Sequence, residues 1–508
     1  MFSRRAELLE KNPPREGERI ISTLKPYPAY KDSGMEWLGQ VPEHWEVLPG
    51  RTVFREINDR GHPDEQMLSV TITRGVLRQA DLLADSSKKD SSNEDKSNYK
   101  LVQPGDLVYN KMRAWQGAVG VSAYRGIVSP AYIVQRLRSA ENLPRYMHFL
   151  LRTPLFASEA ERWSYGITSD QWSLRAEEFK CIYFSLPPLP EQTAIVRFLD
   201  WAERRIRRVI RARKKRIKLL EEYKQALINQ AVTGKIDVRW GKPYPKYKDS
   251  GVEWLGNVPA HWEVRRLKQI VRLNPSKAEA RVLLEHDAPV TFLPMERVYT
   301  DGRIEATEHL PVSSVWNGFT YFRRGDVIVA KITPCFENGK GACLDTLPTE
   351  VGFGSTEFHV LRAGNSIRAP FLYRITTLPD FRRLGAEAMT GAAGQQRVPA
   401  SFIANFAVPC PPLPEQTAIV EYLDAQTTKI DAAIAAARRE IELLREYRTR
   451  LIADVVTGKV DVREVAARLP EEPAEEEAEL EDTEETAEGE AADNEAAEET
   501  FSEEEVEP

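Results

Sequence analysis

The segment YPAYKDSGMEWLGQVPEHWEV, residues 27–47, returns almost unchanged as YPKYKDSGVEWLGNVPAHWEV, residues 244–264, and this repetition decides the fold. A second block, PPLPEQTAIVRFLD beginning at Pro187, returns as PPLPEQTAIVEYLD beginning at Pro411. The two copies are 217 residues apart in the first block and 224 residues apart in the second. A repeat of this length contains a whole domain, so the chain carries two copies of one unit, and the second copy has seven extra residues in its middle.

The segments between these blocks diverge, although short correspondences survive. QPGDLVYNKM, beginning at Gln103, is similar to RRGDVIVAKI, beginning at Arg323. The runs GDLVYN, IVSPAYIV, DVIVAKI and EFHVLRA are bounded by glycine, proline and asparagine and predict strands, whereas residues 144–151 predict a helix. We therefore expect both middle segments to share one α/β fold, of the α+β kind, with different surfaces.

A helical pattern follows each PPLPEQ motif. From Pro190 and Pro414 onward no proline or glycine occurs until Gly234 and Gly458, which predicts two helices of about 40 residues. Their apolar residues alternate in steps of four and three, so we expect the helices to pair as an antiparallel coiled coil. These apolar residues are Ile206, Ile210, Ile217, Leu220 and Leu227 in the first helix and Ile430, Ile434, Ala437, Ile441, Leu444 and Leu451 in the second.

The repeat predicts five segments along the chain. We expect globular domains at residues 27–190 and 244–414, each followed by a long helix, at residues 191–232 and 415–456. Residues 465–508 are rich in glutamate and alanine, which is typical of a disordered acidic tail. An antiparallel helix pair would give the two domains pseudo-twofold symmetry, which on DNA suits two half-sites separated by a gap. Because the two middle segments differ, we expect the half-sites to differ as well.

Composition and charge indicate the class of partner. The chain is 42% hydrophobic and 29% charged, it has no apolar run that could span a membrane, and its four cysteines form no CxxC pair, so we expect a cytoplasmic protein with reduced thiols. The net charge is -7, but residues 471–508 contain 20 acidic and no basic residues, which leaves +13 for residues 1–470. A basic body favours a polyanionic partner.

The repeated blocks resemble those of the specificity subunits of type I restriction-modification systems. The similarity rests on the PPLPEQTAIV entry to each long helix and the SGxEWLGxVPxHWEV entry to each variable domain, and it covers residues 27–463. It implies two target-recognition domains that alternate with two helices, in a subunit that binds double-stranded DNA and does no chemistry. The implied partners are two modification subunits, which methylate adenine with S-adenosylmethionine, and restriction subunits, which use ATP and Mg²⁺.

The sequence offers little support for chemistry or a cofactor in this chain. Asn12-Pro13-Pro14 is similar to a methyltransferase NPPY motif, but Arg15 replaces the aromatic residue that would stack on a flipped base. Pro63-Asp64 with Glu94-Asp95-Lys96 mimics a nuclease motif, but Glu94 lies in a polar loop. The chain has no GxxxxGK[ST] motif, and His44 and His261 adjoin tryptophans, which favours packing over metal binding. We expect no catalytic residue and no metal.

Two pairs of loops are candidate DNA contacts because they present amide and basic side chains, which read base edges and phosphates. The first pair is NKMRAWQGAVG, from Asn110, and AKITPCFENGKG, from Ala330. The second pair is WSYGITSDQWSLR, from Trp163, and TGAAGQQRVP, from Thr390. Polar turns of ordinary structural function are the alternative interpretation. The candidate residues are Lys111, Arg113, Gln116, Tyr165, Thr168, Gln171 and Arg175 in the first copy and Lys331, Thr333, Asn338, Lys340, Gln395, Gln396 and Arg397 in the second.

The first long helix carries an uneven charge. Residues 203–218 contain ten basic residues and one glutamate, whereas residues 427–442 contain three basic and three acidic residues. A solvated face, contact with DNA between the half-sites and docking of an acidic surface all fit this stretch. A further hypothesis is that the acidic tail competes with DNA for the basic surface. We expect the chain to recognise an asymmetric, gapped DNA sequence; the alternative is a coiled-coil scaffold that organises proteins without reading DNA.

Overall fold

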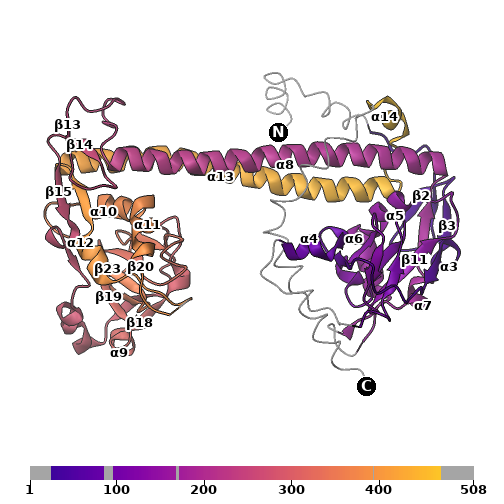
Figure 1. Cartoon of the computed structure of the whole chain (residues 1–508), viewed down its shortest axis with the longest axis horizontal. Helices are drawn as coiled ribbons and strands as arrows, with labels where there is room; N and C mark the ends of the chain where they lie inside the picture. Colours follow the sequence, from indigo (N-terminus) through magenta and orange to yellow (C-terminus); the bar gives the residue numbers. More distant parts are fainter. Residues whose placement is uncertain (1–23, 85–94, 167–170, 393, 471–508) are drawn as a thin grey trace. The chain divides into compact units, whose positions relative to one another are not determined.

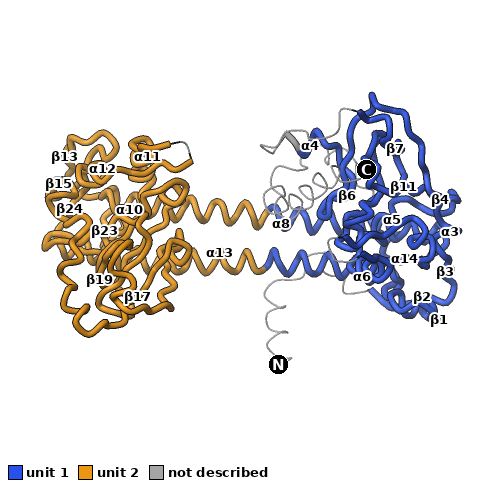
Figure 2. Tube along the Cα trace, turned by 90° about the horizontal axis from the view of Figure 1, so that it is seen from below, with its two compact units in different colours: residues 1–211, 440–508 blue, residues 212–439 orange. Residues whose placement is uncertain are grey.

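The structure is a computed structural model that describes residues 24–84, 95–166, 171–392 and 394–470. The chain divides into two compact units (Figure 2). Unit 1 joins residues 1–211 to residues 440–508, and unit 2 comprises residues 212–439. Because this division cuts both long helices, each unit holds one variable segment together with a part of each helix.

Unit 1 contains β11, which is labelled in Figure 1 and belongs to a four-stranded antiparallel sheet in the order β4-β11-β8-β9. Its strands are Phe54–Ile57, Tyr132–Leu137, Leu107–Asn110 and Val119–Val121. Smaller strand pairs join β1 (Tyr30–Asp32) to β2 (Gln40–Pro42), β3 (Glu46–Pro49) to β12 (Tyr183–Leu186), β5 (Leu68–Thr71) to β6 (Gly75–Arg78) and β7 (Lys100–Val102) to β10 (Gly126–Val128). The shorter helices are α3 (Gly50–Val53), α4 (Gln79–Ala84), η1 (Ala114–Gln116), α5 (Pro144–Leu151), α6 (Pro154–Arg162), α7 (Ala176–Phe179) and α14 (Arg463–Arg468).

Unit 2 repeats this plan with a four-stranded sheet in the order β16-β23-β20-β21. Its strands are Val271–Leu273, Phe358–Ala363, Val327–Ala330 and Gly341–Cys343. A second sheet has the order β18-β17-β22-β19, with strands His309–Pro311, Pro289–Leu293, Val351–Gly354 and Thr320–Arg323. The remaining elements are β13 (Tyr247–Asp249), β14 (Asn257–Pro259), β15 (Glu263–Arg266), β24 (Ala407–Cys410), η3 (Leu267–Gln269), η4 (Lys277–His286), η5 (Met295–Arg297), α9 (Val312–Val315), α10 (Ala369–Thr376), α11 (Pro379–Glu387) and α12 (Ala400–Asn405).

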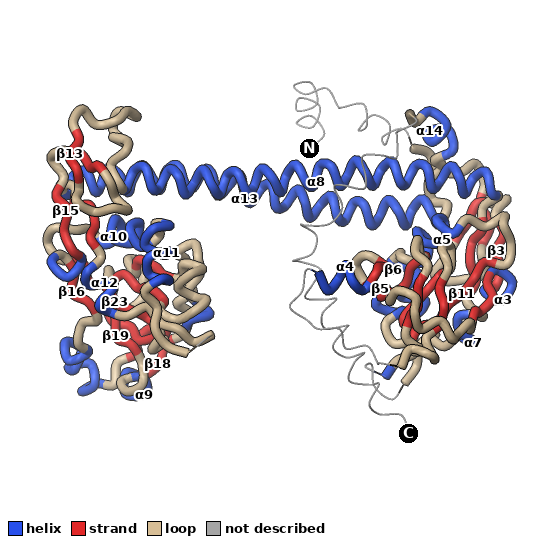
Figure 3. Tube along the Cα trace, in the orientation of Figure 1, coloured by secondary structure: helices blue, strands red, loops and turns tan. Residues whose placement is uncertain are grey.

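The predicted α/β fold and the helix Pro144–Leu151 are confirmed (Figure 3).

Each of the two main sheets contains its own buried ion pair, at matching positions. Asp106 accepts two hydrogen bonds from Arg136, at 2.6 and 2.7 Å, and Asp326 accepts two from Arg362, at 2.7 and 2.8 Å. Each aspartate is 1% exposed and also accepts a backbone N–H from the residue three positions earlier. The GD motif shared by the two middle segments is therefore the buried anchor of each sheet.

The two long helices are α8, Leu189–Val232, and α13, Leu413–Val456. In unit 1 the end of α13 shares a core with the beginning of α8, and in unit 2 the beginning of α13 shares a core with the end of α8. In unit 2, Lys224 pairs with Asp431 at 2.7 Å and Glu221 pairs with Arg438 at 3.1 Å, so the earlier residue of α8 pairs with the later residue of α13. Residue numbers therefore rise on one helix as they fall on the other, and the predicted antiparallel pairing holds within each unit.

The repeated blocks of unit 1 meet around one buried carboxylate, Glu191, in the first turn of α8. The hydroxyl of Tyr27 and the indole Nε1 of Trp45 donate to its Oε1, at 2.6 and 2.7 Å, and His44 Nε2 donates to its Oε2 at 2.8 Å. Burial raises the pKa of Tyr27, which keeps its hydroxyl protonated as a donor. We call this arrangement the glutamate clasp of unit 1, because it fastens the segment before the sheet to the helix after it.

Unit 2 has the same clasp around Glu415. Trp262 Nε1 and His261 Nε2 donate to its two carboxylate oxygens, each at 2.8 Å, and the hydroxyl of Tyr244 donates at 3.4 Å. Arg239 lies 3.4 Å from the same carboxylate. The two histidines of the repeated blocks thus take part in packing and hydrogen bonding around each glutamate.

Glycines in the VTGK motifs connect each clasp to the end of the other long helix. Gly458, with φ of 77°, follows α13, and a Cβ there would lie 2.3 Å from Pro42 Cδ and 3.2 Å from Trp45 Cη2. Gly234, with φ of 72°, follows α8, and a Cβ there would lie 2.5 Å from Pro259 Cδ. Only glycine fits both the left-handed backbone and this close approach, which explains why the motif is repeated.

Backbone bridges complete each unit beside the clasp. In unit 1 the N–H of Asp461 donates to the carbonyl of Lys25 at 2.8 Å, and in unit 2 the N–H of Asp237 donates to the carbonyl of Lys242 at 2.8 Å. After Asp461 the chain forms α14, and Val462, Ala466 and Leu469 are buried in the core of unit 1. The packed chain therefore extends into the segment predicted as an acidic tail, of which residues 471–508 lie outside the described residues.

We expect Glu191→Ala to open the clasp of unit 1 and leave that of unit 2 intact. The change removes the acceptor for two buried donors, and each unsatisfied buried donor costs about 1–3 kcal/mol. Hydrogen exchange should therefore accelerate in peptides from residues 27–47 and not in peptides from residues 244–264. The control is Glu43→Ala, at an exposed position of the same segment. Equal acceleration in both segments, or none, would contradict the assignment.

Candidate nucleic-acid interface

The first candidate loop of unit 1 is a compact turn after β8. Asn110 Oδ1 accepts the N–H of Met112 at 2.9 Å, and Trp115 Nε1 donates to the carbonyl of Met112 at 2.9 Å. The turn closes at Gly117, which has φ of 95°. Arg113 and Gln116 lie on it side by side, joined by a hydrogen bond of 2.9 Å between Nη1 and Oε1. The loop thus presents a basic and an amide group from a rigid backbone.

The second candidate loop of unit 1 packs on the first. The N–H of Leu174 donates to the carbonyl of Lys111 at 2.8 Å, and the rings of Trp115 and Trp172 lie 5.6 Å apart. An antiparallel bridge between Tyr165 and Ser173 closes the base of the loop. The two predicted loops therefore form one surface. Thr168, within residues 167–170, lies outside the described residues.

Unit 2 joins its two candidate loops in the same way. The N–H of Val398 donates to the carbonyl of Lys331 at 2.8 Å, which matches the bond between Leu174 and Lys111. The N–H of Thr333 donates to the carbonyl of Gln396 at 3.0 Å, and Thr333 Oγ1 accepts the N–H of Gln396 at 3.0 Å. The backbone frame is thus common to both units, although the side chains that it carries differ.

The candidate side chains fall into two groups. Gln171, Arg175, Asn338 and Gln395 are exposed, and so is Tyr165. Others are held by neighbours. Lys340 Nζ donates to the carbonyl of Met295 at 3.2 Å, and the Tyr165 hydroxyl donates to Glu178 beneath the guanidinium of Arg175. The structure thus brings all the described candidates to two loop surfaces, on which Tyr165, Gln171, Arg175, Asn338 and Gln395 are the exposed side chains.

Arg397 is tied to a residue that the sequence analysis did not single out. Its guanidinium donates to both carboxylate oxygens of Glu357, at 2.9 Å from Nε and 2.8 Å from Nη2. This pairing lowers the pKa of Glu357 and raises that of Arg397. Glu357 immediately precedes β23, and Ala131 precedes the matching strand β11, so only unit 2 carries this pair. The difference between Glu357 and Ala131 at matching positions was the only sign of this pair in the sequence.

The basic stretch of α8 is a second charged surface. Within unit 1, Arg205, Arg208 and Arg211 are exposed. Glu203, the one acidic residue of the stretch, already pairs with Arg207 at 3.2 Å and lies 3.9 Å from Arg145. The other charged residues of the stretch are all basic, so this part of α8 is strongly positive.

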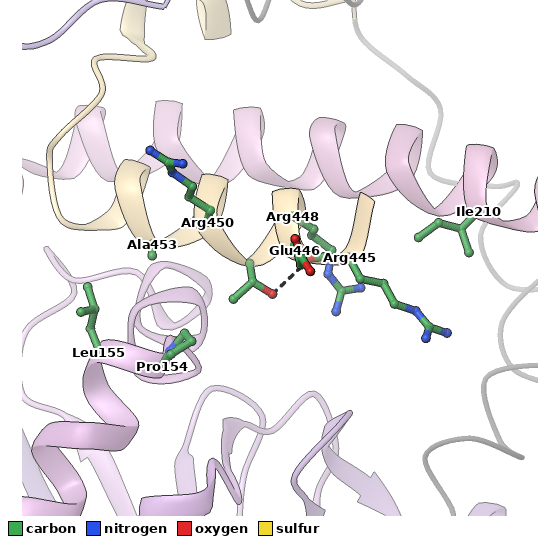
Figure 4. A pocket seen from close by; sticks show the side chains of 9 residues that line it. Pro154, Leu155, Ile210, Arg445, Glu446, Arg448, Arg450 and Ala453 are labelled. Atoms are coloured by element: carbon green, nitrogen blue, oxygen red, sulfur yellow. Dashed lines mark hydrogen bonds between the residues drawn. The ribbon is translucent and has the colours of Figure 1, made fainter. Parts of the chain in front are cut away.

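A groove of about 570 Å³ lies between α6 and α13 in unit 1 (Figure 4). Pro154 and Leu155 form one wall, and Ile210 of α8 lies at one end. The other wall is α13, which contributes Arg445, Glu446, Arg448, Thr449, Arg450 and Ala453. The groove is open to solvent, whereas small-molecule sites are usually concave and bury most of their ligand, so its form does not indicate a small-molecule site.

The candidate catalytic motifs lie partly outside the described residues. Asn12, Pro13, Pro14 and Glu94 lie outside the described residues. Among the residues that are described, no cluster of three histidine, cysteine, aspartate or glutamate side chains could hold a metal ion. None of the described helices has the length and apolar character that crossing a bilayer requires.

Comparison with known proteins identifies the repeated domain. The family model described as "Type I restriction modification DNA specificity domain" matches residues 50–219 and again residues 259–443. The two matches follow the two copies of the repeat and together include every described candidate loop.

Two curated relatives and one solved structure are similar to this chain. The specificity subunits of the type I restriction enzymes EcoAI and EcoEI, both from Escherichia coli, are 36% and 37% identical over 207 and 182 residues. These matches cover 40% and 35% of this chain but only 33% and 30% of the two relatives, so the chain spans about a third of their length. A structure described as "Structural basis underlying complex assembly and conformational transition of the type I R-M system" superposes with a TM-score of 0.60 at 16% identity, covering 82% of this chain and 98% of that one. It shares the fold.

A buried histidine supports the loop surface of unit 2. His359 on β23 donates from Nε2 to the carbonyl of Val398 at 2.8 Å. Burial lowers the pKa of His359, and the charge of Lys331 acts in the same direction. The unfolded chain, in which a histidine has a pKa of about 6.5, therefore binds the proton first as the pH falls. The contribution of His359 to the stability of unit 2 is therefore complete above a pH of about 6.5 and is lost as the pH falls below that value.

We expect hydrogen exchange in β20 and β23 to accelerate between pH 7.5 and pH 5.5, after correction for intrinsic rates. His359→Ile should weaken this dependence, because it removes the group that titrates. Isoleucine is chosen because it occupies the matching position, Ile133, in unit 1. The control is His309→Gln, at an exposed histidine of the same unit. An unchanged pH dependence in His359→Ile would contradict the role of this residue.

Proposed function

The chain belongs to the family of type I restriction-modification DNA specificity domains, and we propose that it reads an asymmetric, gapped DNA target without catalysing a reaction. One observation carries the proposal: two loop surfaces with the same backbone frame present different side chains. Arginine and glutamine or asparagine side chains are the groups that read guanine and adenine edges in the major groove. A shared frame with unlike side chains suits two unlike half-sites.

The loop residues divide into shared and differing positions. Lys111 and Lys331 occupy matching positions at the joint between the loops, and Gln171 matches Gln395 at the 224-residue offset. Next to this glutamine the copies differ, with Trp172 in unit 1 and Gln396 in unit 2. We infer that the lysines contact phosphate, which carries no sequence information, that the matched glutamines each contact a base in their own half-site, and that the differing positions make the two half-sites unlike.

The partners and cofactors follow from the family. The chain would hold two modification subunits, which methylate adenine with S-adenosylmethionine, and would recruit restriction subunits that use ATP and Mg²⁺. All three cofactors would bind the partner subunits, and the complex would act on DNA in the cytoplasm. A scaffold that does not read DNA is not favoured, because the matched family is described as a DNA specificity domain.

A map of methylated adenines tests the proposal directly. DNA from cells that express this chain with its modification subunit should carry one gapped motif, which disappears from cells that lack only this chain. If the subunits are expressed and assembled and no motif depends on the chain, the proposed function is wrong.

Substitutions in the loops should act on one half-site at a time. We expect Gln395→Ala to relax the base preference in one half of the motif and Gln171→Ala to relax it in the other. A bidentate contact with a base contributes about 1–3 kcal/mol of discrimination. The measurement is methylation of a library that varies each half-site separately. If either variant weakens methylation equally for all sequences, that glutamine does not read bases.

Arg397→Ala tests the remaining strong candidate. If the guanidinium reads a base, relaxed specificity should be confined to the half-site that Gln395→Ala affects. Glu357→Gln is the matched variant, because it removes the carboxylate charge that pairs with Arg397 and leaves the arginine itself in place. An equal loss at both half-sites, or on random DNA, would show that Arg397 contacts phosphate or supports the fold.

A further inference from the structure

We propose that the guanidinium of Arg382, which lies against the first candidate loop of unit 2, binds a phosphate of the DNA backbone. Arg382 is the fourth residue of α11. The assignment rests on the proposed function and deepens it, because it adds a phosphate contact to one of the two half-sites. The position of the side chain, its missing counter-charge and the pairing of its neighbour all support it.

The guanidinium packs on Gly339, between the candidate DNA contacts Asn338 and Lys340 in the sequence. A Cβ at Gly339 would lie 2.1 Å from Arg382 Cζ, 2.2 Å from Nη2 and 2.6 Å from Nη1. The end of the arginine side chain, rather than its stem, therefore occupies the space beside this loop. Gly339 has φ of 75°, so glycine alone combines this backbone conformation with room for the guanidinium. The loop is built around the charged group.

The positive charge of Arg382 has no counter-charge among the residues that the structure describes. Its Nε is buried and has no hydrogen-bond partner. Burial lowers the pKa of Arg382, and the ionisable group that acts in the other direction is the hydroxyl of Tyr373. Burial also raises the pKa of Tyr373 to about 12, so that hydroxyl is uncharged at neutral pH. A partly buried guanidinium without a partner costs free energy, which an anionic ligand would recover.

The next residue of the same helix shows the contrast. Arg383 donates to Asp380 Oδ1 and to Glu387 Oε1, each at 3.0 Å. These carboxylates are the acidic side chains of α11, and both are used by the exposed arginine. An arginine that serves only the fold would be expected to have such a partner, most of all where it is partly buried. The helix balances the charge of Arg383 and leaves that of Arg382 for a ligand.

Unit 1 has the same turn without the arginine. The helices α6 and α11 both begin with proline, and their fourth residues are Ala157 and Arg382. Gly117 takes the place of Gly339, two residues before the next strand, and has φ of 95°. The nearest atom to a Cβ at Gly117 would be Ile72 Cγ2, at 4.0 Å. The proposed contact is therefore confined to the half-site that unit 2 binds.

The recessed position favours a phosphate over a base as the ligand. Arg382 is partly exposed although its Nε is buried, so the outer edge of the guanidinium is the part that can reach a ligand. That edge carries paired N–H donors, which match two phosphate oxygens. Reading a base edge requires a side chain that extends into a groove, whereas phosphates lie on the outside of the duplex. Gly339 has no side chain that would keep a phosphate away.

The first test compares Arg382→Met with Arg383→Met in the full chain assembled with its modification subunit. Both variants remove one positive charge from α11 and keep a good helix former. On a library of duplexes, Arg382→Met should weaken binding about tenfold at low salt for all sequences alike. It should also reduce the slope of log affinity against log salt by about 0.9, the value for one phosphate contact. Arg383→Met is the matched control, and it should leave both quantities unchanged.

Several outcomes would overturn the assignment. If Arg383→Met weakens binding equally, the complex responds to overall charge. If Arg382→Met weakens binding only where one base pair is present, the guanidinium reads a base and not a phosphate. If the complex binds duplexes and Arg382→Met changes neither quantity, no phosphate is held there. A complex that binds no duplex in any variant would contradict the proposed function and this assignment with it.

A second variant tests the position of the charge rather than its presence. Gly339→Ala adds a Cβ that displaces the guanidinium and leaves the net charge unchanged, so it should also weaken binding. Combined with Arg382→Met it should have little further effect, because both changes remove the same contact. If the two effects add, the alanine acts through the loop and not through Arg382, and the geometric basis of the assignment fails.

A readout without DNA tests the missing counter-charge by itself. Replacing an unpaired, partly buried charge by an apolar side chain of similar volume removes a cost, so we expect Arg382→Met to raise the melting temperature of the free chain by about 2 °C. An arginine that supports the fold would show the opposite sign. Weaker binding together with higher stability is the combination that the proposal requires, and a lower melting temperature would contradict it.

Discussion

The buried carboxylate of each glutamate clasp is the contact on which the rest of the architecture depends. Glu191 lies in the first turn of α8 and accepts hydrogen bonds from Tyr27, His44 and Trp45, which precede the main sheet by sequence. The same tryptophan packs against Gly458, at the end of α13. One group therefore fixes three segments that are far apart in the chain. Removing a buried acceptor costs more free energy than the hydrogen bond itself contributes. A substitution at this contact in one segment would therefore also destabilise the packing of the other two.

The clasps constrain the repeated blocks and not the variable segments between them. Their sheets contain the Asp106–Arg136 and Asp326–Arg362 ion pairs, and in both units the two loops are joined by a backbone bond to the carbonyl of Lys111 or Lys331. Backbone bonds do not depend on side-chain identity. The exposed positions of the loops can therefore change without disturbing the frame, as the proposed reading of two unlike half-sites requires.

The sequence predicted the frame better than the site. The run without proline or glycine after each PPLPEQ motif predicted the two long helices, which begin at Leu189 and Leu413, because such a run is a local signal. Glu191 lies in a repeated block, yet its role depends on neighbours about 150 residues away, which no local pattern contains. The pairing of Arg397 with Glu357 was missed for the same reason: residues 40 positions apart meet only after β23 is in place.

The backbone bridges beside the clasps have a consequence for the order of the chain. In unit 2, Asp237 and Lys242 are bridged and also joined covalently through four intervening residues, whereas in unit 1 Asp461 and Lys25 make the same bridge with no direct link between them. Corresponding segments therefore lie side by side in both units, and only unit 2 joins them directly through the chain. A chain reordered by joining the segments at the unit 1 bridge and separating them at the unit 2 bridge would keep both glutamate clasps, provided that it kept α14, whose Val462, Ala466 and Leu469 are buried in the core of unit 1.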